Sequence, residues 1–316
     1  MIARLWMALA AASLMLAACT QSPHQSSNGT SGQGSHGGAH GLAAVLAGLG
    51  HRATKGPSYY LSLGDSLAVG LQPGPGGSDN PTAQGYPDLL ERKLHTRIPG
   101  LRLVKLGCSG ETTSTMIYGG RCGYPAGSQL AQAVRFLRSH HGKVALVTID
   151  IGANDPNSCV LHQPVSRMFS CLPARINQTE RNIVKIMARL RAAAGRHVLI
   201  VGMTYYVPEL GLWARSPTGR EVALLTEGLA AGVNHLLVVR YHRFGARVAD
   251  VFGAFKSADF SGMSRNRHNP RFMPPSVRAV CSLTWMCAAR PRGPNEHANT
   301  AGYRVIARAF WRAIIG

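Results

Sequence analysis

Apolar positions along the chain follow two kinds of pattern. Short runs rich in branched and aromatic residues, typical of buried strands, alternate with longer stretches in which apolar residues recur at helical spacing. We expect strands at 59–63, 101–106, 144–151, 197–203 and 246–251, and helices at 129–141, 173–194, 217–241 and 300–315. Strands that alternate with helices pair with one another in parallel, because each helix forms the crossover between two strands. The pattern therefore predicts an α/β protein, a three-layer α/β/α sandwich around a central, mainly parallel five-stranded sheet.

The segment 256–295 lacks a regular period. Prolines interrupt it at positions 270, 274, 275, 291 and 294, and a proline inside a helix removes a backbone hydrogen bond. We therefore expect a long loop without a helix. A loop of this length is either a lid that contacts substrate or a solvated insertion, and the sequence leaves both open.

The N-terminus predicts an export signal followed by a tether. Arg4 precedes an apolar run over 5–18 that is too short to span a bilayer, and Leu16-Ala17-Ala18-Cys19 has the form of a bacterial lipobox. We expect residues 1–19 to direct export and Cys19 to be lipidated, with ordinary signal cleavage nearby as the alternative. Residues 20–56, rich in Gly, Ser, Gln and His, predict a flexible tether rather than a metal site, and residues 57–316 predict one globular domain.

The charge of the chain is strongly positive. Its 34 Lys and Arg outnumber its 14 Asp and Glu, which gives a formal net charge of +20. Such a charge suits nucleic acid, an anionic envelope surface or an acidic medium. The arginines are scattered, without a dense basic run or interleaved aromatic residues, so we expect no nucleic-acid partner.

Cysteine usage supports export independently of the signal. Six of the seven cysteines remain when Cys19 is set aside, an even number that suits disulfides in an oxidising compartment. Neighbours along the sequence suggest the pairs Cys108–Cys122, Cys159–Cys171 and Cys281–Cys287, although other connectivities remain open. The close Cys-x-x-Cys spacing of a zinc site is absent from the sequence, so we expect no metal.

Residues that can carry chemistry follow the predicted strands. Gly64, Asp65 and Ser66 come directly after the first apolar run, where glycine permits a sharp turn and the N–H groups of a starting helix stabilise negative charge. This pattern presents Ser66 as a nucleophile. Gly110 and Asn154 follow the second and third runs, and because parallel strands end at one edge of a sheet, we expect the three loops to converge.

A nucleophilic serine needs a general base. Of the 13 histidines, His297 alone stands immediately before a helix start, in a short loop that fixes its backbone, and we assign it as the base. The backbone N–H groups of Ser66 and Gly110 and the side-chain amide of Asn154 are three neutral donors for the oxyanion of a tetrahedral intermediate.

These residues stand in four blocks whose order is similar to that of a known family. The blocks are Gly64-Asp65-Ser66-Leu67, Leu106-Gly107-Cys108-Ser109-Gly110, Gly152-Ala153-Asn154-Asp155 and Asn295-Glu296-His297. From residue 58 onward the chain resembles the GDSL lipase/esterase family, also called SGNH hydrolases. The resemblance implies a flavodoxin-like fold, attack of Ser66 on an ester carbonyl, proton transfer to His297, an oxyanion hole with Gly110 and Asn154, and no metal or organic cofactor.

One position departs from the pattern of the family. Members commonly carry an aspartate three residues before the histidine, where it orients the imidazole, and that position here is Pro294. Proline keeps its carbonyl, and some secreted actinobacterial members use a main-chain carbonyl at this place. We predict a dyad of Ser66 and His297 in which the Pro294 carbonyl accepts from Nδ1–H. A triad completed by Asp250 or Glu296 is the alternative.

The sequence therefore predicts an exported, monomeric serine esterase or lipase, either anchored to the cell envelope or secreted. It would hydrolyse small-molecule, lipid or acylated-glycan esters through an acyl-enzyme. The alternative is a non-catalytic envelope lipoprotein of the same fold that binds a glycan or an anionic polymer. Paired carboxylates for glycosidic chemistry, Asp65 and Asp155, are a weaker hypothesis, because Asp65 suits a helix cap.

Overall fold

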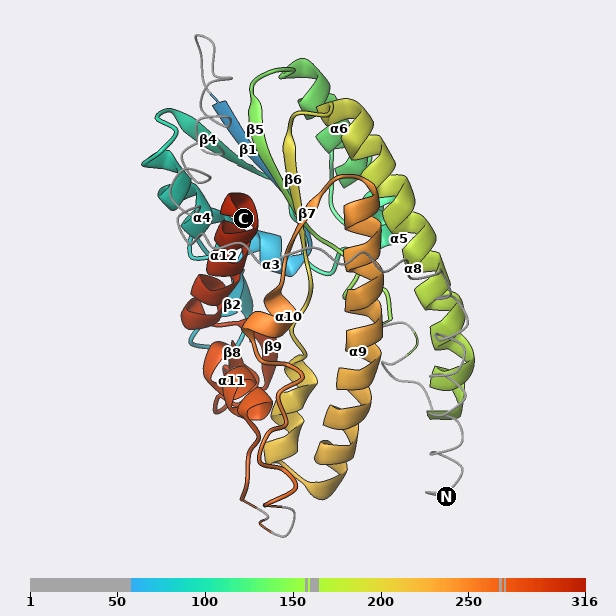
Figure 1. The fold of residues 1–316 in the computed structure, drawn as a ribbon, viewed down its shortest axis with the longest axis vertical. Coiled ribbons are helices and arrows are strands. Elements are labelled where there is room, and N and C mark those ends of the chain that lie inside the picture. The colour runs from blue at the N-terminus through green and yellow to red at the C-terminus, as the bar shows by residue number, and fades with distance from the viewer. Residues whose placement is uncertain (1–57, 157–158, 160–164, 267–268, 270) are drawn as a thin grey trace, which may run out of the picture. The chain divides into compact units, whose positions relative to one another are not determined.

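Five parallel strands form the central sheet in the computed structural model, which describes residues 58–156, 159, 165–266, 269 and 271–316 (Figure 1). They are β1 (Ser58–Gly64), β4 (Leu101–Lys105), β5 (Val144–Asp150), β6 (Leu199–Met203) and β7 (Arg247–Ala249). Their order is β4-β1-β5-β6-β7, and every neighbouring pair is parallel. The five strands and the parallel sheet expected from the sequence are confirmed. The winding of the chain reverses between β1 and β5, and ligands of such sheets bind beyond the carboxyl ends of the strands at this point.

Helices cover both faces of the sheet, which confirms the three predicted layers (Figure 1). On one face, α4 (Tyr86–His95) packs against α12 (Thr300–Ile315). The rings of Tyr86 and Phe310 stack there, with their centroids 4.4 Å apart. The other face carries α5 (Thr113–Tyr118), α6 (Gln129–Ser139), α8 (Val165–Ala194) and α9 (Pro217–Arg243). Because both faces are covered, β5 is buried along its whole length, as its continuous apolar run predicts.

Two of the long helices differ from the rest. The helix expected at 173–194 begins earlier, at Val165, and contains Pro173, which is exposed. Among the described residues, α9 is the one helix that is long and apolar enough to cross a membrane.

Short elements complete the fold and lie mostly beyond the carboxyl edge of the sheet. They are α3 (Ser66–Val69), β2 (Leu71–Pro73), β3 (Asp79–Pro81), the 3-10 helix η1 (Pro208–Ala214), α10 (Val251–Ala254), α11 (Pro275–Leu283), β8 (Thr284–Trp285) and β9 (Asn295–Ala298). The antiparallel pairs β2–β3 and β8–β9 form two small sheets.

The expectation of a helix-free segment at 256–295 is wrong. Pro275 is the first residue of α11, and Pro274 stands at its cap. A proline is tolerated at the first helical position, because the N–H that it lacks has no partner within the helix there. Prolines break a helix when they stand inside it, whereas Pro274 and Pro275 stand at the start of α11.

The structure joins the same three cysteine pairs that the sequence suggested. Disulfides link Cys108 to Cys122, Cys159 to Cys171 and Cys281 to Cys287. The expected signal at 1–19 with its Cys19, and the tether at 20–56, lie outside the described residues.

Candidate active site

Ser66 is the first residue of α3 and follows a turn that only glycine can occupy. Gly64 has a φ of 140°, and a Cβ there would lie 2.2 Å from the carbonyl oxygen of Asp150 on β5. The side chain of Gln129 holds the same residue: Gly64 N donates to Oε1 at 2.7 Å, and Nε2 donates to Gly64 O at 3.0 Å. The position of the serine is therefore set by the buried end of the sheet.

Two buried carboxyl groups lie beneath this turn. Asp65 caps α3, as predicted, with Oδ1 accepting from Leu67 N at 2.9 Å and Oδ2 accepting from Tyr205 OH at 2.8 Å. Asp150 accepts from the backbone N–H of Asp65 at 3.3 Å and from Tyr86 OH at 2.5 Å. Because its oxygens hold the helix start, Asp65 serves the structure rather than paired-carboxylate chemistry.

The two carboxyl groups do not share their proton equally. Burial raises the pKa of Asp150 well above its usual range, and the charge of nearby Asp65 raises it further. Burial also raises the pKa of Asp65, but the Leu67 N–H and the neighbouring His297 favour its ionised form. Of the two carboxyl groups, Asp150 is the one whose neutral form the surroundings favour more strongly.

The loops that carry Gly110 and Asn154 flank the serine on its two sides. Gly110 has a φ of 71° and follows β4, where Cys108 N donates to Gly64 O at 3.0 Å. Asn154 follows β5, and its Nδ2 donates to the carbonyl of Glu111 at 3.0 Å. This bond ties the two loops together and turns the amide nitrogen of Asn154 toward the Gly110 loop.

The second hypothetical carboxylate, Asp155, also has a structural role. Burial raises its pKa, and its oxygens accept from the backbone N–H of Thr113, at 2.9 Å, and from the Thr113 hydroxyl. The bonds fix the start of α5 next to the Asn154 turn. Like Asp65, this residue supports the loops around the serine.

His297 lies on β9, which contacts α3, the short helix that begins at Ser66. Its side chain is buried, and Nδ1 lies 2.9 Å from Asn295 Oδ1 and 3.4 Å from Asp79 Oδ2. Asn295 Nδ2 in turn donates to Asp79 Oδ1 at 2.8 Å. In the described part of the chain, Nε2 of His297 is buried without a hydrogen-bond partner.

These contacts determine the tautomer of the imidazole. The bond to the Asp79 carboxylate identifies the nitrogen of the Asn295 amide, so its oxygen faces His297 and can only accept. Nδ1 therefore carries the hydrogen. In the neutral ring, the lone pair is then on the other nitrogen, Nε2.

The orienting group expected from the sequence is not the one in the structure. No hydrogen bond from His297 to the Pro294 carbonyl occurs among the described residues; Asn295 and Asp79 take its place. The two alternative acids lie elsewhere: Asp250 caps α10 through Gly253 N, and Glu296 is exposed. A side-chain oxygen two residues before the histidine is within reach of the ring, which removes the need for the carbonyl.

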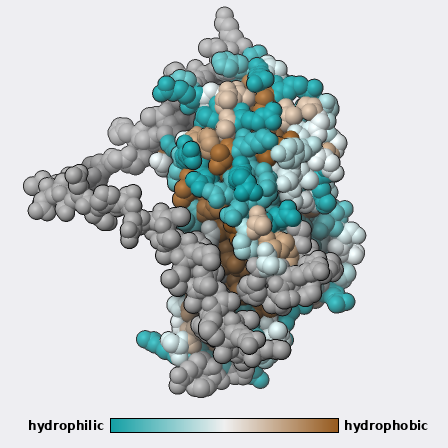
Figure 2. Space-filling view, turned by 90° about the vertical axis from the view of Figure 1, so that its right-hand side faces the viewer, coloured by the Kyte–Doolittle hydropathy of each residue, from teal (hydrophilic) through white to brown (hydrophobic). Residues whose placement is uncertain are grey.

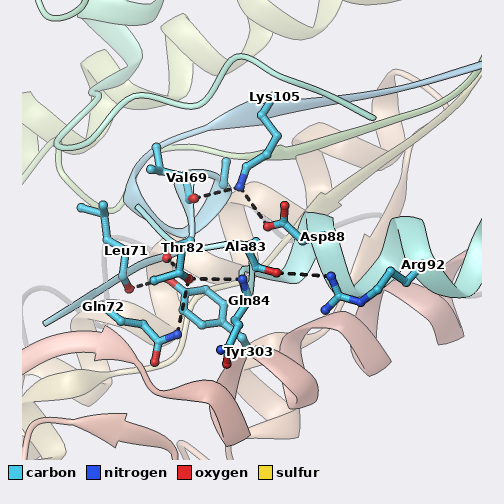
Figure 3. A network of polar contacts seen from close by, with 12 residues as sticks. Val69, Leu71, Gln72, Thr82, Ala83, Gln84, Asp88, Arg92, Lys105 and Tyr303 are labelled. Carbon is cyan, nitrogen blue, oxygen red and sulfur yellow. Dashed lines mark hydrogen bonds and ion pairs between the residues drawn. The ribbon is translucent and has the colours of Figure 1, made fainter. Parts of the chain in front are cut away.

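The hairpin β2–β3 carries Asp79 and is fixed from several sides (Figure 3). Thr82 Oγ1 donates to Gly70 O at 2.7 Å, and Tyr303 OH donates to Leu71 O at 2.9 Å. Lys105 Nζ contacts Val69 O at 2.9 Å next to it. Sequence reasoning missed Asp79, because the only local sign of it is an acidic residue in a Gly- and Pro-rich turn.

The described residues contain no group of three His, Cys, Asp or Glu side chains arranged to hold a metal ion. They do contain a serine at the start of α3, loops with backbone and amide donors after the two neighbouring strands, and an imidazole oriented by Asn295 on β9, which contacts α3. Such a set can activate a hydroxyl and stabilise an oxyanion.

Comparisons with known proteins agree with this fold. The model of the GDSL-like lipase/acylhydrolase family matches residues 62–305. No curated protein matches the chain. Among solved structures, a lipase from a goat rumen metagenome is 17% identical with a TM-score of 0.50, and the match covers 81% of this chain and 97% of that one.

Two matches come from Streptomyces. The phospholipase A1 of Streptomyces albidoflavus NA297 is 19% identical over 82% of this chain and 100% of its own, with a TM-score of 0.48. An extracellular lipase of Streptomyces rimosus is 19% identical over 81% and 99%, with the same TM-score of 0.48.

Proposed function

Because the chain belongs to the GDSL-like lipase/acylhydrolase family, which makes it an ester hydrolase, we propose that it uses Ser66 as nucleophile and His297 as general base. The observation that carries the proposal is the state of the imidazole. Nδ1 is held by Asn295, and Nε2 is buried without a hydrogen-bond partner among the residues described. A neutral imidazole fixed in this tautomer offers the lone pair that a general base needs.

In the proposed reaction, Ser66 Oγ attacks the ester carbonyl carbon while its proton passes to Nε2 of His297. The tetrahedral intermediate collapses, and the leaving alkoxide takes the proton from Nε2. Water then attacks the acyl-enzyme, again giving its proton to His297. The second tetrahedral intermediate collapses, Nε2 returns this proton to Ser66 Oγ, and the carboxylic acid leaves.

Asn295 and Asp79 have the role of the orienting acid in this proposal. The amide oxygen of Asn295 holds Nδ1–H, and the Asp79 carboxylate at 3.4 Å stabilises the imidazolium that forms during the attack. Asp65, directly before Ser66, is a second acidic group near the imidazole: burial raises its pKa, and nearby His297 lowers it. The site thus keeps an acidic partner, although position 294 is a proline.

The oxyanion of the intermediate would be bound by the N–H groups of Ser66 and Gly110 and by the amide of Asn154. Two features support this assignment: Ser66 stands at a helix start, and the bond to Glu111 turns the amide nitrogen of Asn154 toward the Gly110 loop. An Asn154→Ala variant should lose about 10²–10³ in kcat, the usual effect of removing one such donor.

The direct test is hydrolysis of p-nitrophenyl acetate and butyrate by the wild type, Ser66→Ala and Ser139→Ala. Ser139 is an exposed serine of α6 and is the matched control. We expect Ser66→Ala to lose activity by about 10⁶-fold and Ser139→Ala to keep it. A fluorophosphonate should label only proteins that retain Ser66. Equal rates for Ser66→Ala and wild type would instead support the non-catalytic envelope lipoprotein.

We place the protein outside the cytoplasm. The three disulfides support an oxidising compartment, and the N-terminal sequence predicts export with lipidation of Cys19. Metabolic labelling with a fatty acid should mark the wild type and not Cys19→Ser. Small-molecule, lipid and acylated-glycan esters are the substrate classes to compare in a panel of acyl lengths.

A further inference from the structure

Helix α9 is apolar on almost every side but is not a core helix. Its 27 residues bury five on the side that faces the domain: Gly219, Ala223, Asn234, Leu237 and Tyr241. In its most apolar stretch, only 17% of the residues are buried. A helix that is apolar all round normally lies in a core or in a membrane, so the remaining surface of α9 needs an explanation.

The contacts of α9 hold one side of it against the folded domain. The side chain of Asn234 accepts from Tyr205 N at 2.8 Å and donates to Tyr205 O at 2.9 Å, which fastens the middle of the helix to the domain. The ring of Tyr241 covers Gly202 of β6 so closely that a Cβ there would lie 2.4 Å from it. One side of α9 is therefore part of the folded domain along its length.

The opposite side of α9 forms an apolar surface, which we call the α9 face. At about 100° per residue, it lies across the helix from Ala223, Leu237 and Tyr241. Its apolar members are Leu224, Leu225, Gly228, Gly232, Leu236 and Val239, and the same spacing places exposed Glu221, His235 and Arg243 on this side. Leu224 and Val239 are 41% and 43% exposed, and a Cβ on either glycine would meet no atom within 4 Å. Figure 2 shows hydrophobic areas next to hydrophilic ones on the side of the molecule that lies at the right in Figure 1.

Basic side chains border the α9 face. Arg181 of α8 lines a shallow pocket between α8 and α9 together with Arg240 and Arg243. His235 and His242 are exposed on α9 itself. Three acidic residues lie in this region. Glu180 is paired with Arg240, Glu221 is exposed near the start of α9, and Glu227 is half-buried.

The net charge of the chain favours an anionic lipid surface over a second copy of the chain as the partner of this face. A second copy would bring another net charge of +20 against the first, and like charge opposes self-association. An anionic lipid surface attracts the same charge, and its acyl boundary accepts exposed leucine and valine side chains. We propose that the α9 face binds the surface of an anionic lipid membrane, with α9 lying parallel to it.

This proposal is independent of the esterase chemistry and can be tested separately. The full chain is mixed with sucrose-loaded vesicles of phosphatidylcholine, with or without phosphatidylglycerol, and the bound fraction is measured after sedimentation. Cys19 is replaced by Ser in every protein, so that a lipid on that cysteine cannot supply the binding. The test variant is Leu224→Glu/Val239→Glu.

The matched control is Met263→Glu/Ala289→Glu. It makes the same change in net charge at two exposed residues outside α9, so it separates loss of the apolar face from loss of charge. Thermal melting checks that both variants fold. Hydrolysis of a soluble ester should be unchanged in both, because none of the four residues belongs to the candidate active site.

We expect the wild type to bind vesicles with phosphatidylglycerol at least tenfold better than vesicles without it. The α9 variant should lose at least tenfold in binding, and the control should stay within about threefold of the wild type. Equal binding of the α9 variant and the wild type would overturn the proposal, as would equal binding to both vesicles. A dimer of the wild type that the α9 variant abolishes would assign the face to a second copy instead.

Discussion

The two sides of the candidate active site are held in different ways. Ser66 stands on the buried end of the sheet, where Gly64 is clamped by Gln129 and lies against Asp150. His297 stands on a small two-stranded sheet and is oriented by Asn295 and Asp79, which are partly open to solvent. The first side is determined by core packing, the second by a few polar contacts. Changes to the first should therefore cost folding, and changes to the second should cost activity in a folded protein.

The largest effect is expected from Gly64→Ala. The added methyl group would overlap the Asp150 backbone, and a φ of 140° is unfavourable for alanine, so the free energy of unfolding should fall by more than about 4 kcal/mol. Gly142→Ala is the matched control, because Gly142 also has a positive φ, of 76°, but no atom near the Cβ position. It should cost about 1–2 kcal/mol. Urea unfolding measures both free energies. Similar losses would show that close packing against Asp150 adds nothing to the backbone strain at Gly64.

The next effect is expected from Asn295→Ala on the histidine side. Loss of the acceptor for Nδ1–H frees the imidazole and its tautomer, so kcat should fall by about 10³–10⁴, as for the orienting acid of a triad. The melting temperature should change little, because Asn295 is only partly buried. Steady-state kinetics with p-nitrophenyl acetate gives the result. Glu296→Ala and Asp250→Asn serve as controls, and a loss of similar size in either one would return the orienting role to that acid.

The disulfides allow the two sides to be compared by stability. Cys108–Cys122 closes a loop of 14 residues beside Gly110, and Cys281–Cys287 closes a loop of 6 residues near β8. From loop length alone, the Ser double variants should lose about 3 and about 2 kcal/mol, respectively. Urea unfolding under non-reducing conditions measures both. A larger loss at 281–287 than at 108–122 would mean that the histidine side depends more on its crosslink than loop length predicts.

The smallest effect is expected from Asp150→Asn and depends on pH. The raised pKa of Asp150 means that the folded protein keeps a proton that the unfolded chain releases above the usual aspartate pKa of about 4. The wild type therefore loses stability from this group as the pH rises from about 4 toward the folded pKa, and asparagine removes that loss. The stability of Asp150→Asn relative to wild type should rise by on the order of 1 kcal/mol between pH 4 and pH 8, measured by urea unfolding. A relative stability that falls with pH would show that Asp150 is ionised in the folded state.

The parts of the site that local patterns encode were predictable from the sequence. Ser66, Gly110 and Asn154 each follow an apolar run, and the parallel sheet places the ends of such runs at one edge. The five strands and the three cysteine pairs follow from similarly local signals.

The orienting contact of His297 was not predictable in this way. Asp79 and Asn295 are separated by 216 positions and meet only because the β2–β3 hairpin folds against β9. Gln129 reaches Gly64 from a helix 65 positions away, again without a local sign in the sequence. Long-range polar contacts of single side chains leave no period that a pattern can reveal.

Asp79 and His297 lie on different segments of the chain, the β2–β3 hairpin and β9, and this has a practical consequence. In a protein whose acid and base share one short segment, any insertion displaces both. Here Asp79, directly after the turn at 74–78, reaches the imidazole both by itself and through the amide of Asn295. A library of lengths and sequences in that turn is therefore a means to vary the position of the Asp79 carboxylate against the imidazole, while the segment that holds the ring keeps its native sequence.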